Sequence, residues 1–363
     1  MVLFYNVAQP QNIKAVYTPF DQIDFLVKMP AGREYKQGSG RCSGKFKVYV
    51  TPQNGTRRLA TAADSIFLNQ YAGAHSLYRS FTTSVNDQTT ENIAYYPRYV
   101  AMKKQATNPQ THLYTSSENL TELTGLYGNK ILTGESTSGY VYYSFAPMIA
   151  INKSSTNLPQ SKFVQIRIMA QLASGLEAFY TTSTSTVFSA IDYEIEDLQF
   201  AWYEEPQKTG GDVVLNTTYL NKQSIVSNHT NLNLFCPNVY DAVSVSFIKQ
   251  ADLNNTLTDN NACYQIPLIN RVEFTLNGND SPISYPLESY EDIIVNYKKS
   301  LSAGEKHSFS KSLIVSGQVF GLGCSFPTSV NDKLGINIDI DDALNVSLLQ
   351  YDAYMYVNGY LTM

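Results

Sequence analysis

A short strand-and-turn pattern occurs twice in the sequence, about half the chain apart. In each copy, every second residue of a strand-length segment is apolar or β-branched, and two turn-forming residues follow. The copies are Phe81, Thr83 and Val85 before Asn86-Asp87, and Val272, Phe274 and Leu276 before Asn277-Gly278. This alternation is typical of a half-buried strand, and Asn-Gly suits a type I′ hairpin turn. The sequence therefore predicts two β-hairpins and favours a chain of two similar halves.

Length and composition also favour two β-rich domains. A chain of 363 residues exceeds what one hydrophobic core usually serves. The chain contains 27 Tyr and 17 Phe but one Trp, and only 16% of its residues are charged. Aromatic residues favour strands, and the many Asn, Ser and Thr residues favour turns. We therefore expect strands joined by polar loops.

Strand-like segments recur throughout the chain. They are residues 22–30, 44–52, 161–172, 192–205, 232–248, 264–278, 310–323, 334–340 and 348–363. The residues predicted to face a core are Val164, Ile166, Ile168, Ala170 and Leu172 in one segment and Leu198, Phe200 and Trp202 in another. Many strands with few helices are typical of β-sandwiches. The fold class is thus predicted to be all-β.

Residues 204–212 form the best linker, because Pro206 ends a strand and Gly210-Gly211 permits a change of direction. The first unit is accordingly predicted at residues 1–205 and the second at residues 206–363. The longest candidate insertion between predicted strands lies at about residues 101–160, and we expect it to form a modest outer loop.

Two segments have helical patterns, and each follows one of the hairpins. Residues 286–301 are expected to form a helix of three to four turns with Pro286 in its first turn. The apolar stripe of this helix comprises Leu287, Tyr290, Ile293, Ile294, Tyr297 and Leu301. Residues 115–128 give a weaker helix prediction.

No segment has the spacing of a catalytic or metal-binding motif. The histidines are His75, His112, His229 and His307, and none has a second ligand at metal-binding spacing. The cysteines are Cys42, Cys236, Cys263 and Cys324, and we expect buried free thiols. Asp339, Asp341 and Asp342 could hold Ca²⁺, although a solvated loop is favoured; residues 194–197 have the same ambiguity. We predict no catalytic, cofactor-binding or metal site.

Net charge and hydropathy argue against a nucleic-acid-binding, a secreted and a membrane-spanning protein. The net charge of −5 disfavours direct binding of nucleic acid by the folded surface. The first residues lack the basic and apolar regions of a signal peptide, and no segment approaches the roughly 20 apolar residues of a membrane span. We therefore expect synthesis in the cytoplasm without processing.

Four segments together resemble the double jelly-roll major capsid proteins of the lineage that includes tectivirus-like phages, polinton-like viruses, virophages and adenoviruses. The segments are residues 74–102, 163–172, 192–204 and 268–301. The resemblance implies two tandem eight-stranded jelly rolls with short helices in the connecting loops. It also implies a homotrimeric, pseudo-hexagonal capsomer in the icosahedral shell of a virion that is synthesised and assembled inside a host cell.

The implied partners are neighbouring capsomers, penton proteins and minor capsid proteins, with an internal membrane left open. No enzymatic activity is implied. The sequence leaves two other functions open. One is a host-binding or spike protein of tandem β-sandwiches that recognises glycan, and the other is a polysaccharide-degrading enzyme on a β-sandwich.

Overall fold

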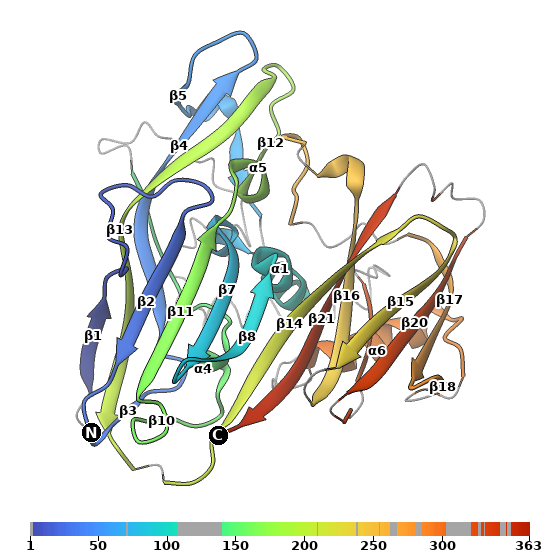
Figure 1. Ribbon diagram of the computed structural model, residues 1–363. Helices are drawn as coiled ribbons and strands as arrows, with labels where there is room; N and C mark the ends of the chain where they lie inside the picture. Colours follow the sequence, from blue (N-terminus) through green and yellow to red (C-terminus); the bar gives the residue numbers. More distant parts are fainter. Residues whose placement is uncertain are drawn as a thin grey trace.

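The computed structural model describes residues 3–69, 72–106, 140–208, 210–236, 239–253, 255–261, 267–280, 283, 285–302, 321–325, 328–329, 331–341, 346 and 350–363. Figure 1 shows two β-sandwiches standing side by side, the first in blue and green and the second in yellow to red. Within the described residues, no helix is long and apolar enough to cross a membrane.

The first sandwich consists of two antiparallel sheets. One has the order β1 (Phe4–Ala8), β13 (Phe188–Pro206), β4 (Arg41–Pro52) and β9 (Val141–Phe145), extended by β3 (Arg33–Tyr35), β5 (Arg58–Leu59) and β10 (Leu158–Pro159). The other has the order β2 (Gln22–Lys28), β11 (Gln165–Leu172), β7 (Tyr78–Val85) and β8 (Gln88–Ala94). A separate pair joins β6 (Ile66–Leu68) to β12 (Phe179–Thr181).

The second sandwich has the same plan. One sheet has the order β14 (Val214–Ile225), β21 (Tyr351–Thr362), β16 (Tyr240–Lys249) and β19 (Leu322–Ser325). The other has the order β15 (His229–Cys236), β20 (Asp332–Ile340), β17 (Ile269–Leu276) and β18 (Asn279–Asp280).

Short helices lie in the connections between the strands. They are η1 (Ala62–Asp64), η2 (Gly73–Leu77), α4 (Ala150–Lys153), α5 (Gly175–Ala178) and η3 (Gln250–Asp252).

Both sandwiches repeat one order of strand pairing. In chain order, the eight principal strands of the first sandwich are β1, β2, β4, β7, β8, β9, β11 and β13, and those of the second are β14 to β21. In one sheet of each sandwich, the first of the eight pairs with the last, the last with the third, and the third with the sixth. In the facing sheet the second pairs with the seventh, the seventh with the fourth, and the fourth with the fifth. This is the topology of the eight-stranded jelly roll. The predicted fold of two tandem jelly rolls is therefore confirmed.

The two predicted hairpins occupy equivalent positions, joining the fourth and fifth strands of each sandwich. Asn86 and Asp87 between β7 and β8 have φ angles of 49° and 65°, and Asn277 and Gly278 between β17 and β18 have φ angles of 55° and 82°. Positive φ at both central residues is the requirement of a type I′ turn. The repeated pattern thus marks the same turn of the same fold.

A helix follows each hairpin. The predicted helix forms as α6 (Tyr290–Ser302), but it begins after Pro286, so the placement of that proline in the first turn was wrong. Ser289 caps the helix, since its Oγ accepts from the amide of Asp292 at 3.1 Å. Leu287 instead pairs with Val272 as an isolated bridge. The equivalent helix of the first sandwich, α1 (Tyr96–Ala106), was not predicted.

Two other expectations concern the same connection of the first sandwich. The weaker helix prediction, residues 115–128, lies outside the described residues. The described parts of residues 101–160 do not form an outer loop, because they supply the end of α1, strands β9 and β10, and α4. Residues 107–139 of that segment lie outside the described residues.

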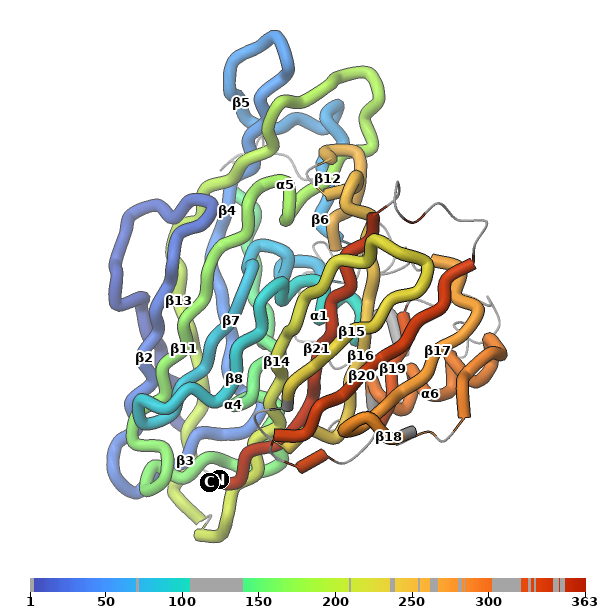
Figure 2. The backbone as a smooth tube through the Cα atoms, turned by 45° about the vertical axis from the view of Figure 1, so that its right-hand side comes forward, coloured from blue at the N-terminus to red at the C-terminus, as the bar shows by residue number. Residues whose placement is uncertain are grey.

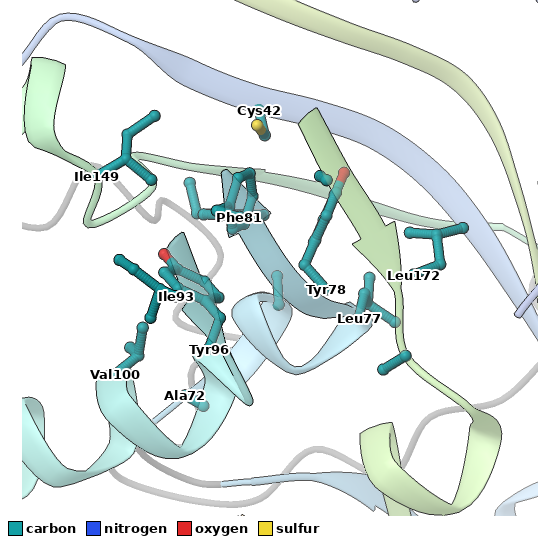
Figure 3. Close-up of a cluster of buried hydrophobic side chains, with 14 of the residues drawn as sticks. Cys42, Ala72, Leu77, Tyr78, Phe81, Ile93, Tyr96, Val100, Ile149 and Leu172 are labelled. Carbon is teal, nitrogen blue, oxygen red and sulfur yellow. The ribbon is translucent and has the colours of Figure 1, made fainter. Parts of the chain in front are cut away.

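The hydrophobic core forms two clusters, one in each sandwich. Figure 3 shows part of the first, where Tyr78 and Phe81 of β7 and Tyr96 of α1 lie beneath Cys42 of β4. The predicted core faces are buried except for Val164, which is 54% exposed just before β11. The first cluster also includes residues after β13: Val213, Leu215, Ile248, Tyr297, Leu301, Tyr354 and Tyr356. Part of the second sandwich therefore packs against the core of the first.

The connection between the sandwiches runs from the end of β13 at Pro206 to the start of β14 at Val214. In Figure 1 it runs along the bottom of the picture from the end of β13 to the start of β14, near the C-terminus. The division at residues 205 and 206 stays a prediction, and we propose residues 207–213 as the connecting segment.

Candidate functional site: the junction between the sandwiches

The histidines of the described residues have structural partners. His75 is fully buried, its Nδ1 lies 2.7 Å from the Tyr96 hydroxyl, and its ring centroid lies 4.2 Å from that of Phe145. The Nδ1 of His229 lies 2.9 Å from Oδ1 of Asp339 on the neighbouring strand. His112 and His307 lie outside the described residues.

The acidic and thiol groups singled out from the sequence are separated from one another. Asp339 faces His229, the backbone of Asp341 pairs with Leu268 and Asn228, and Asp342 lies outside the described residues. In the described part of the chain, no three His, Cys, Asp or Glu side chains gather as metal ligands would. Among the cysteines, Cys42 and Cys324 are buried free thiols as predicted, and burial raises the pKa of each.

Glu194 and Glu196 hold cations and tyrosines on the outer side of β13. The carboxylate of Glu194 accepts from Tyr49 at 2.9 Å and from Arg57 at 2.8 Å. Glu196 accepts from the Tyr140 hydroxyl at 2.6 Å and lies 3.3 Å from the ammonium of Lys45. Half-exposed ion pairs of this kind are structural and contribute little.

The most elaborate polar arrangement lies between the two sandwiches, and the sequence did not reveal it. Tyr219 of β14 pairs in parallel with Asn92 of β8, which joins a sheet of each sandwich into one sheet of eight strands. Figures 1 and 2 both show β14 and β21 continuing the row formed by β11, β7 and β8. The Tyr219 hydroxyl also donates to the carbonyl of Thr90 at 2.7 Å.

A buried carboxylate lies at the centre of this junction. Glu91 of β8 is fully buried and accepts hydrogen bonds from the amides of Ala150 in α4 and Thr218 in β14, the latter at 3.2 Å. The ammonium of Lys153 lies 3.4 Å from the same carboxylate and donates to the Thr218 hydroxyl at 2.8 Å. Burial raises the pKa of Glu91, while Lys153 and the two amides oppose that rise.

Aromatic side chains of the first sandwich cover the outer face of β21. The ring of Tyr99 on α1 lies 5.3 Å from that of Tyr356, and the ring of Tyr95 lies 4.9 Å from that of Tyr354. The Tyr356 hydroxyl donates to the carbonyl of Tyr95 at 3.0 Å. Such aromatic pairs add to the free energy gained by burying their area.

Helix α1 also contacts α6 and the segment before β17. The ammonium of Lys103 donates to the carbonyl of Leu301 at 2.7 Å, and Arg98 donates to the carbonyl of Asn260. As a result, every residue from Tyr96 to Lys104 is buried, including three cations. The junction therefore fixes the two sandwiches relative to each other.

A small cavity of about 40 Å³ lies at one end of the junction. Its lining includes Arg79, Arg98, Glu177, Asn260 and Tyr354. A buried water needs roughly 10–15 Å³ on a comparable scale, so the cavity has room for a few waters and is too small for a substrate. The arrangement is suited to holding the two units together.

Comparison with solved structures finds this fold over nearly the whole chain in viral capsid proteins. The PBCV-1 virus capsid structure matches over 99% of this chain and 94% of that chain, with a TM-score of 0.63 and 9% identity. The mavirus major capsid protein matches over 99% and 90%, with a TM-score of 0.53 and 10% identity. The Faustovirus major capsid protein matches over 100% and 90%, with a TM-score of 0.58 and 8% identity.

At these identities the likeness establishes the fold: the chain has the double jelly-roll fold of these capsid proteins. No family model matches the sequence, and no curated protein is similar to it in sequence.

Proposed function

We propose that this chain is a viral major capsid protein, three copies of which form a pseudo-hexagonal capsomer of an icosahedral shell. The observation that carries the proposal is the repeated jelly roll, whose two copies are held upright side by side by the buried junction. Two similar units per chain and three chains give six similar units, which is what a near-sixfold ring requires. The solved structures that share the fold over 99% or more of this chain are described as capsid structures and major capsid proteins.

The rest of the molecule is consistent with a structural role. In the described part of the chain the junction contains a small cavity, no cluster of His, Cys, Asp or Glu could hold a metal ion, and the chain carries few charged residues. A shell subunit needs large side surfaces rather than a substrate cleft. We propose that the protein is not an enzyme and that it does not bind nucleic acid directly.

The location and partners follow from the same proposal. The protein is made and assembled inside the host cell and resides in the virion. Its partners are two further copies in the capsomer, neighbouring capsomers, and penton and minor capsid proteins. The proposal leaves open whether the shell encloses an internal membrane.

Two measurements test the proposal. Mass photometry of the purified protein should show a species near three times 40.5 kDa. Electron microscopy of the source material should show icosahedral particles with trimeric capsomers built from this chain. A strictly monomeric protein that is absent from particles would overturn the proposal. Glycan binding by that monomer would then support the alternative of a host-binding protein.

A further inference from the structure

A buried amine, a carboxylate and a side-chain amide meet at the centre of the junction. The ammonium of Lys153 in α4 lies 3.4 Å from the carboxylate of Glu91 in β8 and donates to the Thr218 hydroxyl at 2.8 Å. That hydroxyl in turn donates to Oδ1 of Asn358 in β21 at 3.0 Å. Lys153 of the first sandwich and Asn358 of the second therefore contact the same hydroxyl group.

These groups are shielded from water. The side chains of Lys153 and Glu91 are 8% and 0% exposed, and Asn358 is buried. The ring of Tyr99 lies 5.6 Å from the Lys153 ammonium. Such surroundings disfavour charge, so a proton moves more easily from the ammonium to the carboxylate than it would in water.

The amide of Asn358 is held by its oxygen. Its Nδ2 atom is buried and has no hydrogen-bond partner among the described residues. A buried donor without an acceptor is costly, and such a group in a folded protein calls for an explanation. Loss of this nitrogen would break no hydrogen bond that the described residues make.

The elements around the site hold the reacting groups in place. Thr218 and Asn358 lie directly opposite each other where β14 pairs with β21. The side-chain amide of Asn216 donates to the carbonyl of Lys153 at 2.9 Å, which ties α4 to β14. Glu91 accepts from the amide of Thr218 at 3.2 Å. Groups fixed in this way react far faster than the same groups free in solution.

We propose that Lys153 and Asn358 form an isopeptide bond that joins the two jelly rolls covalently. A proton first passes from the ammonium of Lys153 to the carboxylate of Glu91, which leaves a neutral amine. The amine attacks Cγ of Asn358 and forms a C–N bond, while the Thr218 hydroxyl donates to the oxygen that gains negative charge.

The step is completed by the departure of ammonia. Glu91 gives its proton to the leaving nitrogen, and the bond between Cγ and Nδ2 breaks. Glu91 then takes the second proton that the new amide nitrogen releases. The reaction exchanges one amide for another and needs no oxidant or further reactant. Burial raises the pKa of Glu91, which suits this carboxyl to hold a proton between the two transfers.

The link gives the junction a strength that its hydrogen bonds alone lack. A covalent bond between distant segments restricts the unfolded chain and thereby stabilises the folded one, as a disulfide does. Unlike a disulfide, an amide also forms and persists in a reducing compartment. The bond lies within one chain, so it forms in a monomer and in a trimer alike.

Mass spectrometry of the denatured, intact protein tests the proposal. The wild type should be lighter than its sequence by one ammonia, and protease digestion should yield one branched peptide that contains Lys153 and Asn358. Lys153→Arg keeps a cation beside Glu91 but forms no link, so its mass should equal that of its sequence. Glu91→Gln removes the proton carrier and should form the link at least about tenfold more slowly.

Lys162→Arg is the matched control. Lys162 also reaches the second unit, where its ammonium donates to the carbonyl of Met363 at 2.9 Å, but it takes no part in the proposed reaction. This variant should therefore retain the wild-type mass deficit. Circular dichroism should show that the three variants remain folded, and the branched peptide of the wild type is a result that needs no variant.

Two outcomes would overturn the proposal. One is a wild-type mass equal to that of the sequence after the folded protein has stood at neutral pH. The other is a deficit that persists in Lys153→Arg, since it would come from a different asparagine, such as Asn277 before Gly278, that loses ammonia by closing a ring with the backbone. Either outcome leaves the proposed capsid function standing, because that function is tested by the trimer and the particles.

Discussion

Glu91 of β8 accepts a hydrogen bond from the amide of Thr218 in β14, a contact across the junction between two jelly rolls. The two residues are 127 positions apart in the chain. A buried carboxylate with an ammonium and two amides around it holds a single geometry, because each of these groups is costly to leave unpaired. The contact therefore helps to set the angle at which the two units stand.

Replacing Glu91 should destabilise the protein strongly. Glu91→Leu would remove the carboxylate that balances the buried charge of Lys153 and accepts from two amides, and we expect a loss of about 3–5 kcal/mol in the free energy of unfolding. Glu91→Gln keeps an acceptor and should cost less. Urea unfolding measures both. Glu288→Ala is the control, because the Glu288 side chain is 65% exposed and should change stability by less than about 0.5 kcal/mol. A loss for Glu91→Leu no larger than that of the control would contradict this role.

The sequence predicted the strands and hairpins because their signals are local. Alternation in β11 and β17 and the turn residues Asn86-Asp87 and Asn277-Gly278 depend on neighbours a few positions away. The junction depends on contacts between distant segments, which leave a weaker trace. One signal of the junction was present in the sequence: Glu91 lies two positions before Ile93, on the same core-facing side of β8, where a carboxylate is unusual.

Helix α1 was missed for a related reason. Its segment contains Pro97 in the first turn and has no single apolar stripe, because the helix is buried on all sides from Tyr96 to Lys104. Helix α6 was found because it is buried on one side only, which gives the periodic pattern that sequence reading detects.

The two units should unfold together. The single tryptophan, Trp202, is buried in the first jelly roll and donates from its indole to Glu204 at 2.9 Å. Its fluorescence therefore reports on the first unit, whereas far-ultraviolet circular dichroism reports on both. Because the first core includes residues of the second unit, such as Tyr354 and Tyr356, the two urea transitions should coincide in the wild type. Distinct midpoints for the two signals would show that the junction does not couple the units.

Stability should fall as pH rises through the range in which Asp259 ionises. Burial raises the pKa of this carboxyl to about 6, against hydrogen bonds from Asn261 and Asn69 and the charge of Arg98. The folded state therefore binds a proton that the unfolded state has lost between about pH 4 and pH 6. In that window stability decreases with pH by at most about 1.4 kcal/mol per unit, and above it this contribution is absent.

Asp259→Asn isolates this contribution, since the other acids titrate equally in both proteins. Unfolding free energies of wild type and variant should diverge from pH 4 to pH 6, with the wild type losing stability relative to the variant, and run parallel above pH 7. A constant difference across the whole range would show that Asp259 does not titrate in this way.

The turn between β17 and β18 should tolerate asparagine at Gly278 but not valine. Gly278 has a φ of 82°, and a Cβ atom added there would meet nothing within 4 Å, so any cost comes from the backbone and not from a clash. A β-branched residue resists positive φ, which gives an expected loss of roughly 1–3 kcal/mol for Gly278→Val. Asparagine adopts the left-handed region readily, so Gly278→Asn should lose much less. Urea midpoints compare the two variants, and equal midpoints would mean that the turn does not require its left-handed residue.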